Sequence, residues 1–170
     1  MRSFVLAGLL VALMATAAPA KEFIAQESDF RCLLDGKKVD GKTFVLFNRN
    51  RGRLRKALHV ARKGKPGKQY PVGTIVQLFP FEAMVKRGGG FNPGGDGWEF
   101  FQLSVTPSGT QIVSRGGAEV ANVVGSCQNC HQNFASQYDL ICEFVIGSSG
   151  LGLTDDQVRS LQAADPRCPH

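Results

Sequence analysis

The chain has 170 residues, of which 43% are hydrophobic and 20% are charged, and its formal net charge at pH 7 is +6. Its length suits a single domain with a real core, and the lack of internal repeats or low-complexity tracts excludes a repeat array. After the N-terminal segment, no stretch approaches the ~20 apolar residues that a transmembrane helix needs, so no stable membrane insertion is expected.

The first twenty residues predict a cleaved signal peptide. Arg2 gives a charged start, residues 4–17 are apolar, and residues 18–20 form a small-residue cleavage site. We predict cleavage after Ala20, which leaves a single domain of residues 21–170 exported to the periplasm. An uncleaved N-terminal anchor is the alternative.

Basic residues are concentrated in one part of the chain. Between Asp40 and Glu82 there is no acidic residue, whereas ten lysines and arginines fall there. We expect a positive surface region, which would speed the encounter with an acidic partner or an anionic surface in a salt-dependent way. Solvated basic loops are the alternative. Export and the absence of interleaved aromatic residues argue against nucleic acid as a partner.

The first half of the chain predicts short strands joined by loops. Residues 21–40 are polar and mixed, and they predict an irregular N-terminal strap. The β-prone runs 43–47 and 57–61 predict two strands separated by a polar, Arg-rich stretch. Glycine and proline in 63–68 predict a loop. Residues 73–86 predict a strand that bends near its proline, because proline cannot donate to a central ladder.

The second half predicts a hairpin followed by helices. Residues 98–106 and 110–114 predict two strands joined through Pro-Ser-Gly. Residues 128–137 predict a short helix. Residues 155–164 predict another helix, which begins after Thr154 as N-cap with a glutamine three residues later, as in a capping box.

The strongest chemical signal is Cys127-Gln128-Asn129-Cys130-His131, which matches the C-x-x-C-H attachment sequence of c-type haem. Thiols three positions apart lie on one face of a helical turn, so each can add to one vinyl group of the porphyrin. His131, the next residue, can then ligate the iron. We therefore expect one covalent haem c at Cys127 and Cys130, with His131 as the metal ligand.

A redox pair, a structural zinc site and a simple disulfide are the alternatives for this motif. Zinc needs a fourth ligand, and the mature chain offers only His59, His170 and the remaining cysteines, none at finger-like spacing. A thioredoxin-like site needs a β-α-β pattern, which is missing here.

Several further blocks accompany the motif in a fixed order. They are Leu58-His59-Val60-Ala61, Tyr70-Pro71-Val72-Gly73-Thr74, Phe81-Glu82-Ala83-Met84-Val85-Lys86-Arg87, Gly97-Trp98-Glu99-Phe100-Phe101 and Tyr138-Asp139. Over roughly residues 57–143 these blocks resemble the cytochrome P-460 / cytochrome c-prime-beta family of mono-haem proteins. The resemblance implies an α+β fold in which a compact antiparallel β-sheet with a few short helices packs one covalently bound haem. It also implies a five-coordinate iron with His131 on the proximal side.

The chain departs from the members of this family that oxidise hydroxylamine. Those proteins carry a lysine that is joined to the macrocycle, after the strand that follows the Gly-Thr pair, and no lysine stands in residues 73–79 here. Lys86 is the next lysine and belongs to another block, so we expect neither the cross-link nor the hydroxylamine chemistry. Glu82 aligns with a distal carboxylate of the family and is a candidate proton relay. A surface glutamate that balances Lys86 or Arg87 is the alternative.

Candidates for the distal side come from the same strand. If residues alternate from Phe79, then Phe79 and Phe81 share one face while Glu82 and Met84 share the other, and the two sets cannot both face the haem. Phe79 and Phe81 would form an apolar cap that admits nitric oxide or carbon monoxide, or else would be ordinary core residues. Met84 would be a sixth iron ligand or a packing residue.

Two further side chains are weaker candidates. His59 lies in an apolar run and is an alternative iron ligand, although a hydrogen-bonded core or edge histidine explains it equally well. Trp98 is expected to pack against the haem edge or in the core.

Three cysteines remain outside the motif: Cys32, Cys142 and Cys168. In an oxidising compartment two of them should form a disulfide. We favour Cys142 with Cys168, which would tie the C-terminal helix to the haem segment; Cys32 with Cys142 is the alternative.

The sequence therefore favours a periplasmic mono-haem c-type cytochrome that transfers single electrons to a redox partner protein or binds a small gaseous ligand such as nitric oxide. The alternatives are an oxidoreductase acting on hydroxylamine or nitric oxide, and a haem-free, disulfide-stapled binding module. A homodimer and a monomer are both open.

Overall fold

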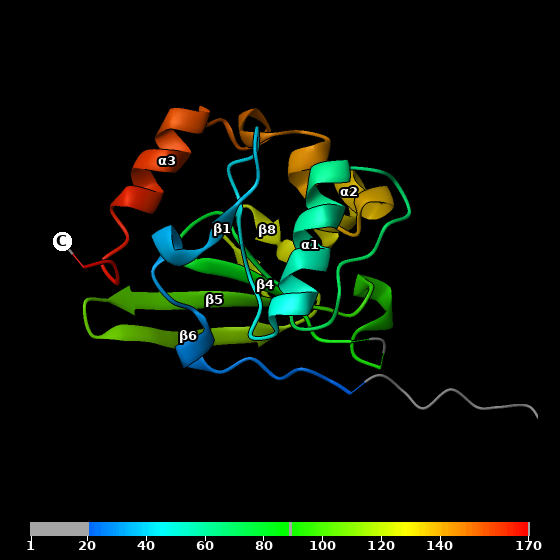
Figure 1. Cartoon of the computed structure of the whole chain (residues 1–170), viewed down its shortest axis with the longest axis horizontal. Helices are drawn as coiled ribbons and strands as arrows, with labels where there is room; N and C mark the ends of the chain where they lie inside the picture. Colours follow the sequence, from blue (N-terminus) through cyan, green and yellow to red (C-terminus); the bar gives the residue numbers. More distant parts are fainter. Residues whose placement is uncertain (1–20, 89, 170) are drawn as a thin grey trace, which may run out of the picture.

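The computed structural model describes residues 21–88 and 90–169, so the predicted signal peptide lies outside the described residues. Its main element is a six-stranded antiparallel sheet whose strands follow one another in chain order (Figure 1). These strands are β1 (Lys37–Lys38), β2 (Val45–Phe47), β3 (Ile75–Gln77), β4 (Glu82–Lys86), β5 (Trp98–Thr106) and β6 (Gly109–Gly116). No helix among the described residues is long and apolar enough to cross a membrane.

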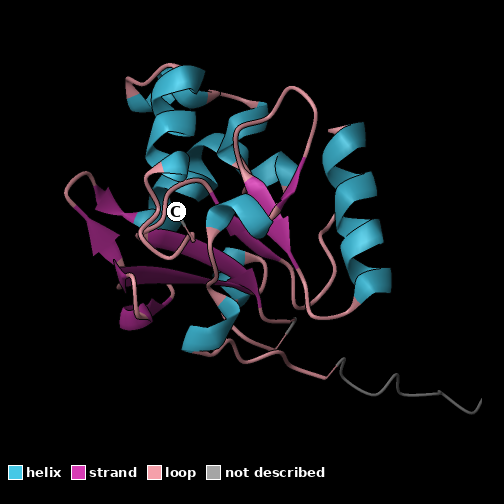
Figure 2. Ribbon diagram, turned by 60° about the vertical axis from the view of Figure 1, so that its left-hand side comes forward, coloured by secondary structure: helices cyan, strands magenta, loops and turns pink. Residues whose placement is uncertain are grey.

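A second sheet and the helices complete the described fold. The small sheet is the hairpin of β7 (Ala121–Asn122) and β8 (Gly125–Ser126), which leads directly into α2 (Cys127–Ala135). The other α-helices of the described chain are α1 (Arg51–Lys63) and α3 (Asp155–Ala163). The α+β class and the antiparallel sheet, which the resemblance implies, are confirmed. Figure 2 shows most of the helical structure gathered on one side of the long β5–β6 hairpin.

Alternating side chains divide the core between the two faces of the main sheet. In β2, Leu46 belongs to one core, whereas Val45 and Phe47 belong to the other. In β5, Phe100 and Phe101 are separated in the same way because successive side chains of a strand point to opposite faces. Each fully buried side chain of this kind stabilises the fold by about 1.5–3 kcal/mol.

Different segments cover these two faces. The first core lies against α1 and α2 and includes Trp98 and Met84. The second is covered by the N-terminal strap, which contributes Ala25, Phe30 and Leu33. The strap contains two short 3₁₀ turns, so its predicted irregular character is largely confirmed.

The strand that we predicted at residues 57–61 is wrong, because this run lies inside α1. Leu54, Ala57, Leu58 and Ala61 are spaced as one face of a helix, and all four contact the first core. The arginines and lysines between them are good helix formers, so the helix includes most of the polar, Arg-rich stretch that we expected to separate two strands. Asn50 caps the helix through its side chain, which accepts from the Arg53 amide at 2.9 Å.

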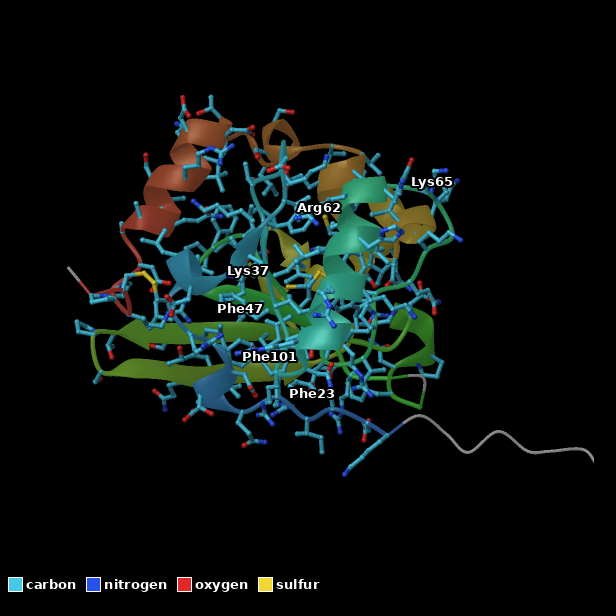
Figure 3. All side chains as sticks on the ribbon, in the orientation of Figure 1. Phe23, Lys37, Phe47, Arg62, Lys65 and Phe101 are labelled. Atoms are coloured by element: carbon cyan, nitrogen blue, oxygen red, sulfur yellow. A yellow bond between two sulfur atoms is a disulfide. The ribbon has the colours of Figure 1, made fainter. Side chains whose placement is uncertain are left out.

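The helix also carries the predicted positive surface. The exposed residues on α1 and the loop after it include Arg51, Arg53, Arg55, Lys56, Arg62, Lys63, Lys65 and Lys68. Figure 3 shows Arg62 and Lys65 near the outer end of α1 and its following loop. The predicted loop at 63–68 is confirmed, since α1 ends at Lys63 and Gly64 follows in the left-handed conformation, with φ of 51°.

The single bent strand that we predicted over residues 73–86 is also wrong. Residues 75–77 and 82–86 form two antiparallel strands, β3 and β4, in which Val76 pairs with Met84. The chain reverses through a turn that contains Pro80, so proline ends a strand here instead of bending one. The Gln77 side chain closes the turn, because its amide donates to the carbonyls of Phe79 and Glu82 at 3.4 and 3.2 Å.

The remaining predicted elements are confirmed. The strand predicted at 43–47 is present as β2, the hairpin as β5 and β6, and the helix of the motif as α2. Helix α3 begins after Thr154, which accepts from the Gln157 amide at 3.2 Å while the Gln157 side chain accepts from the Thr154 amide at 2.8 Å. This is the predicted capping box.

The disulfide pairing that we favoured is wrong. Cys32 is bonded to Cys168, and Cys142 is free. The pairing follows from the way the ends of the described chain meet: the amide of Leu33 donates to the Asp165 carboxylate at 2.9 Å, and the Arg167 guanidinium donates to the carbonyl of Phe30 at 3.0 Å. Cys142 lies instead in a 3₁₀ turn, Cys142–Phe144, that contacts α2.

Candidate functional site

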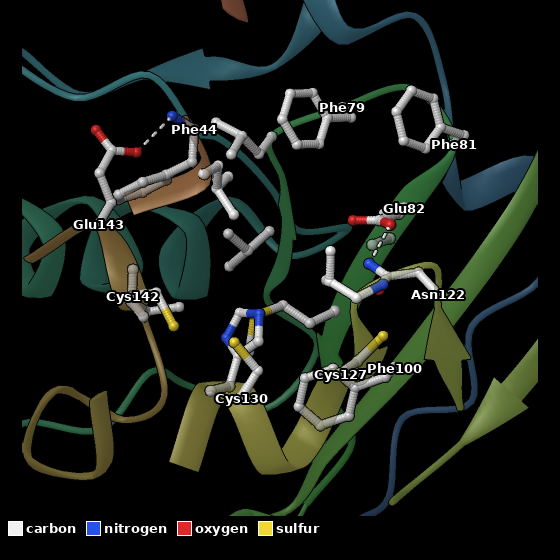
Figure 4. Close-up of a pocket in the computed structure, with 18 of the residues that line it drawn as sticks. Phe44, Phe79, Phe81, Glu82, Phe100, Asn122, Cys127, Cys130, Cys142 and Glu143 are labelled. Atoms are coloured by element: carbon white, nitrogen blue, oxygen red, sulfur yellow. Dashed lines mark hydrogen bonds between the residues drawn. The ribbon is translucent and has the colours of Figure 1, made fainter. Parts of the chain in front are cut away.

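An apolar cavity of about 350 Å³ opens on the face of the sheet that carries the helices. Its walls come from the turn between β3 and β4, from β4 and β5, from the β7–β8 hairpin, from α2 and from residues 141–153. Figure 4 shows Phe79 and Phe81 on one side of the cavity and the C-x-x-C-H helix on the other. An apolar, concave site with a few convergent polar groups is typical of a cofactor pocket.

Helix α2 brings both cysteines of the motif to this cavity. The helix begins after Ser126, whose hydroxyl accepts from the Asn129 amide at 3.4 Å. Cys127 and Cys130 lie one turn apart, and both line the cavity as free thiols (Figure 4). Burial raises the pKa of the Cys127 thiol, and the negative charge of Glu82 raises it further. A redox-active C-x-x-C pair needs the opposite shift, so the redox alternative loses support.

His131 also lines the cavity, and its ring is held in a defined orientation. Its Nδ1 lies 2.6 Å from the carbonyl oxygen of Leu140. A carbonyl can only accept, so Nδ1 carries the proton and Nε2 keeps a free lone pair. Burial lowers the pKa of His131, although the Leu140 carbonyl and the charge of Glu82 oppose this effect. The neutral imidazole with a free Nε2 is the form that ligates a metal.

The opposite wall of the cavity contains two stacked aromatic rings. Phe79 and Phe81 lie in the turn between β3 and β4 with ring centroids 5.4 Å apart and an interplanar angle of 6°. Phe79 is 8% exposed, whereas Phe81 is 45% exposed. Neither belongs to the two core clusters, and only Phe79 is buried.

Met84 and Glu82 face the same cavity from β4. All four residues therefore line one cavity, although the two-residue alternation predicted that the two pairs lie on opposite faces. Phe79 and Phe81 precede β4 in a turn, where the two-residue alternation of a strand does not apply. Met84 is 5% exposed and packs in the first core near Phe100.

Glu82 is tied to the β7–β8 hairpin. Its Oε1 accepts from the Asn122 side-chain amide at 2.8 Å (Figure 4). The surface glutamate that we considered as an alternative is not found, because Lys86 pairs with Asp139 and Arg87 pairs with Glu22 and Glu99. Glu82 is therefore a carboxylate at the cavity wall, held by one hydrogen bond.

Three of the residues singled out in the sequence do not reach the cavity. His59 is exposed on the outer side of α1, so it is not placed as an iron ligand. Trp98 is fully buried in the first core, and its Nε1 donates to Asp139 at 3.1 Å. Lys86 does not line the cavity either, and its Nζ lies 2.5 Å from the carboxylate of Asp139.

Sequence reasoning missed much of the rim of the cavity. Val123, Val124, Leu151 and Leu161 all line the cavity and are all exposed, as is Phe81, which the sequence had singled out. An exposed apolar patch around a cavity marks a place where an apolar group binds. The sequence contains one local signal for this rim: two adjacent valines stand between Asn122 and Gly125, in a turn where exposed residues are usually polar.

Cys142 is a third thiol at the cavity, beside the motif. Burial raises its pKa to about 12, with a further contribution from Cys130. Within residues 21–88 and 90–169, no group of three or more histidine, cysteine, aspartate or glutamate side chains is arranged to hold a metal ion.

These residues fit a covalently attached haem. The apolar wall suits a porphyrin, the two thiols of the motif suit its vinyl groups, and a single imidazole is enough because the porphyrin supplies four nitrogen ligands to the iron. Comparison with known proteins adds no assignment: no family model, no curated protein and no solved structure matches this chain.

Proposed function

We propose that the chain is an exported, periplasmic mono-haem c-type cytochrome. Haem c would be attached through thioether bonds to Cys127 and Cys130, and His131 would ligate its iron. The observation that carries the proposal is the convergence of all three residues on one apolar cavity, with Nδ1 of His131 bonded to a carbonyl and Nε2 left free. When bound, the haem would supply one-electron and ligand-binding chemistry at its iron.

The opposite wall favours binding of a small apolar ligand such as nitric oxide. Phe79 and Phe81 present stacked rings to the cavity, and they would exclude water and polar ligands from the side opposite His131. Single-electron transfer to a redox partner protein is the companion role. The exposed basic face of α1 supports an acidic partner, whose encounter rate should fall as salt is added.

An oxidoreductase acting on hydroxylamine or nitric oxide is the second candidate. One observation favours it: Glu82 lines the cavity and is positioned by Asn122, so it could relay protons to a bound ligand. Against it stands Lys86, which is paired with Asp139 outside the cavity and is not free for a cross-link to the macrocycle. We therefore expect no turnover when hydroxylamine is supplied with an electron acceptor.

Intact-mass and absorption measurements test the haem itself. The full chain is expressed together with cytochrome c maturation proteins, and the mature product should gain the mass of one haem and a Soret band. The double variant with Cys127→Ala and Cys130→Ala should gain neither. Cys142→Ala is the matched control, because it removes a third thiol from the same cavity and should leave the attachment intact.

The outcome decides between the remaining alternatives. A wild-type product without added mass or Soret absorption would leave the haem-free, disulfide-stapled module. If the haem is present, a high-spin ferric spectrum and binding of nitric oxide to the ferrous protein are expected. A low-spin spectrum with a methionine-type charge-transfer band would instead identify Met84 as the sixth ligand.

A further inference from the structure

A buried charged cluster adjoins the turn that contacts His131, and its residues do not line the cavity. Its centre is Asp139, which is 4% exposed. Oδ1 of Asp139 accepts from Nζ of Lys86 at 2.5 Å and from Nε1 of Trp98 at 3.1 Å. Oδ2 accepts from the backbone amide of Tyr70 at 2.7 Å. These donors come from β4, from β5 and from the segment after α1, so Asp139 joins three separate parts of the chain.

Such a cluster is a poor way to gain stability. Taking two charges out of water costs several kcal/mol per ion, and apolar residues of similar volume often stabilise a core equally well. Lys86 is only 4% exposed, so its ammonium group also gives up its water shell. A gain in stability therefore does not account for this cluster.

The backbone at Asp139 connects the cluster to the histidine. Asp139 and Leu140 are consecutive non-glycine residues with positive φ, 51° and 64°. Such a conformation is disfavoured for a residue with a Cβ and persists only where the surroundings hold it. The strained turn presents the carbonyl of Leu140 to Nδ1 of His131 at 2.6 Å, while the amide of Leu140 donates to Ala135 at 3.0 Å.

We infer that the Asp139 cluster is a positioning device for the histidine: the contacts of Asp139 with Lys86, Trp98 and the Tyr70 amide hold the turn whose Leu140 carbonyl orients His131. This inference rests on the proposed function in so far as His131 is the iron ligand. The partner of the non-ligating ring nitrogen fixes the tautomer, the ring orientation and the donor strength of a metal-bound histidine. A firmly held carbonyl makes the imidazole a stronger donor, which favours the ferric state.

Asp139→Asn tests this in the haem-loaded protein. The change keeps the size of the side chain and an acceptor oxygen, but it removes the charge that holds Lys86. The bond from His131 to Leu140 should loosen, so the Fe–His stretching frequency in the ferrous resonance Raman spectrum should fall. The ferrous state should be favoured about threefold, which raises the reduction potential by about 28 mV because a tenfold change equals 59 mV for one electron.

Asp165→Asn is the matched control. Asp165 is also a buried carboxylate, paired with Arg167 at 2.7 Å near the disulfide, and it does not line the cavity. It should lower stability and leave both the potential and the Fe–His frequency at their wild-type values. If Asp139→Asn lowers stability but also leaves both readouts unchanged, the cluster is only structural and the inference is overturned.

A milder variant and a haem-free measurement cover the remaining outcomes. If Asp139→Asn does not fold, Trp98→Phe removes one donor to Asp139 and should move both readouts in the same direction by a smaller amount. Unchanged readouts in this variant would overturn the inference.

The haem-free protein, exported without the maturation proteins, allows a second measurement. The ¹⁵N shifts of the imidazole should show a proton held on Nδ1 of His131 in the wild type and a mixture of tautomers in the Asp139 variant. This test separates the two ideas, since a wild type that never binds haem sinks the proposed function but leaves the tautomer measurable.

Discussion

Removing the disulfide between Cys32 and Cys168 should cost a large share of the stability of the protein. The bond closes a loop with a sequence separation of 136 residues. The chain-entropy relation for a loop of this length gives about 5 kcal/mol, and native disulfides in exported domains typically contribute 2–5 kcal/mol. The hydrogen bond from Leu33 to Asp165 remains in the variant, so the folded geometry should persist and the loss should come mainly from the unfolded state.

The assay is urea unfolding of the double variant with Cys32→Ser and Cys168→Ser against the wild type, both in the same haem state. We expect the free energy of unfolding to fall by about 3–5 kcal/mol, with a drop in Tm of roughly 6–20 °C for a chain of this size. Cys142→Ala, which breaks no disulfide, should stay within about 1 kcal/mol. A double variant as stable as this control, or peptide mapping that finds Cys142 in a disulfide, would refute the reasoning.

Three further predictions concern pH, the cavity and a turn. Burial alone would raise the pKa of Asp165, but the hydrogen bonds from Arg167 and the Leu33 amide together with the charge of Arg167 outweigh it and leave the pKa lowered, so Asp165 stabilises the fold above about pH 4 and loses this effect as the pH falls further. Asp165→Asn should therefore flatten the acid limb of stability in urea titrations from pH 2 to pH 7; an unchanged limb would contradict this. Met84→Leu should leave the ferric absorption spectrum unchanged and alter stability by less than about 1.5 kcal/mol, whereas a change of spin state would make Met84 a ligand. Gly97→Ala should cost at least about 2 kcal/mol in urea unfolding, because Gly97 has φ of 76° and a Cβ there would lie 2.6 Å from the carbonyl of Gly88; wild-type stability would argue against this turn.

The elements that sequence predicted correctly depend on neighbours in the chain. The capping box at Thr154 and Gln157 needs residues three positions apart, and the β5–β6 hairpin needs a tight turn between two β-prone runs. Helix α2 also depends on residues that are close in the chain. For this reason the sequence could place Cys127, Cys130 and His131 on one side of a short helix.

The wrong predictions arose where a local pattern fits two structures. The run at residues 57–61 contains β-prone residues, but the apolar spacing that includes Leu54 is helical, and the core of the sheet provides a surface for that face. At residues 78–81 we assumed that side chains alternate between the two faces of a strand, but these residues form a turn. This error separated Phe79 from Met84, although both line the cavity.

The sequence by itself determined the chemical groups of the candidate site: two thiols and an imidazole at the spacing of haem attachment. Only the tertiary structure decided what surrounds them. The stacked phenylalanines, the carbonyl of Leu140 and the partner of Cys32 come from segments that meet only when the sheet forms. Spacing along the chain governs a helical turn, whereas the walls of a cavity are set by contacts between distant residues, and those contacts exist only once the two faces of the sheet are packed.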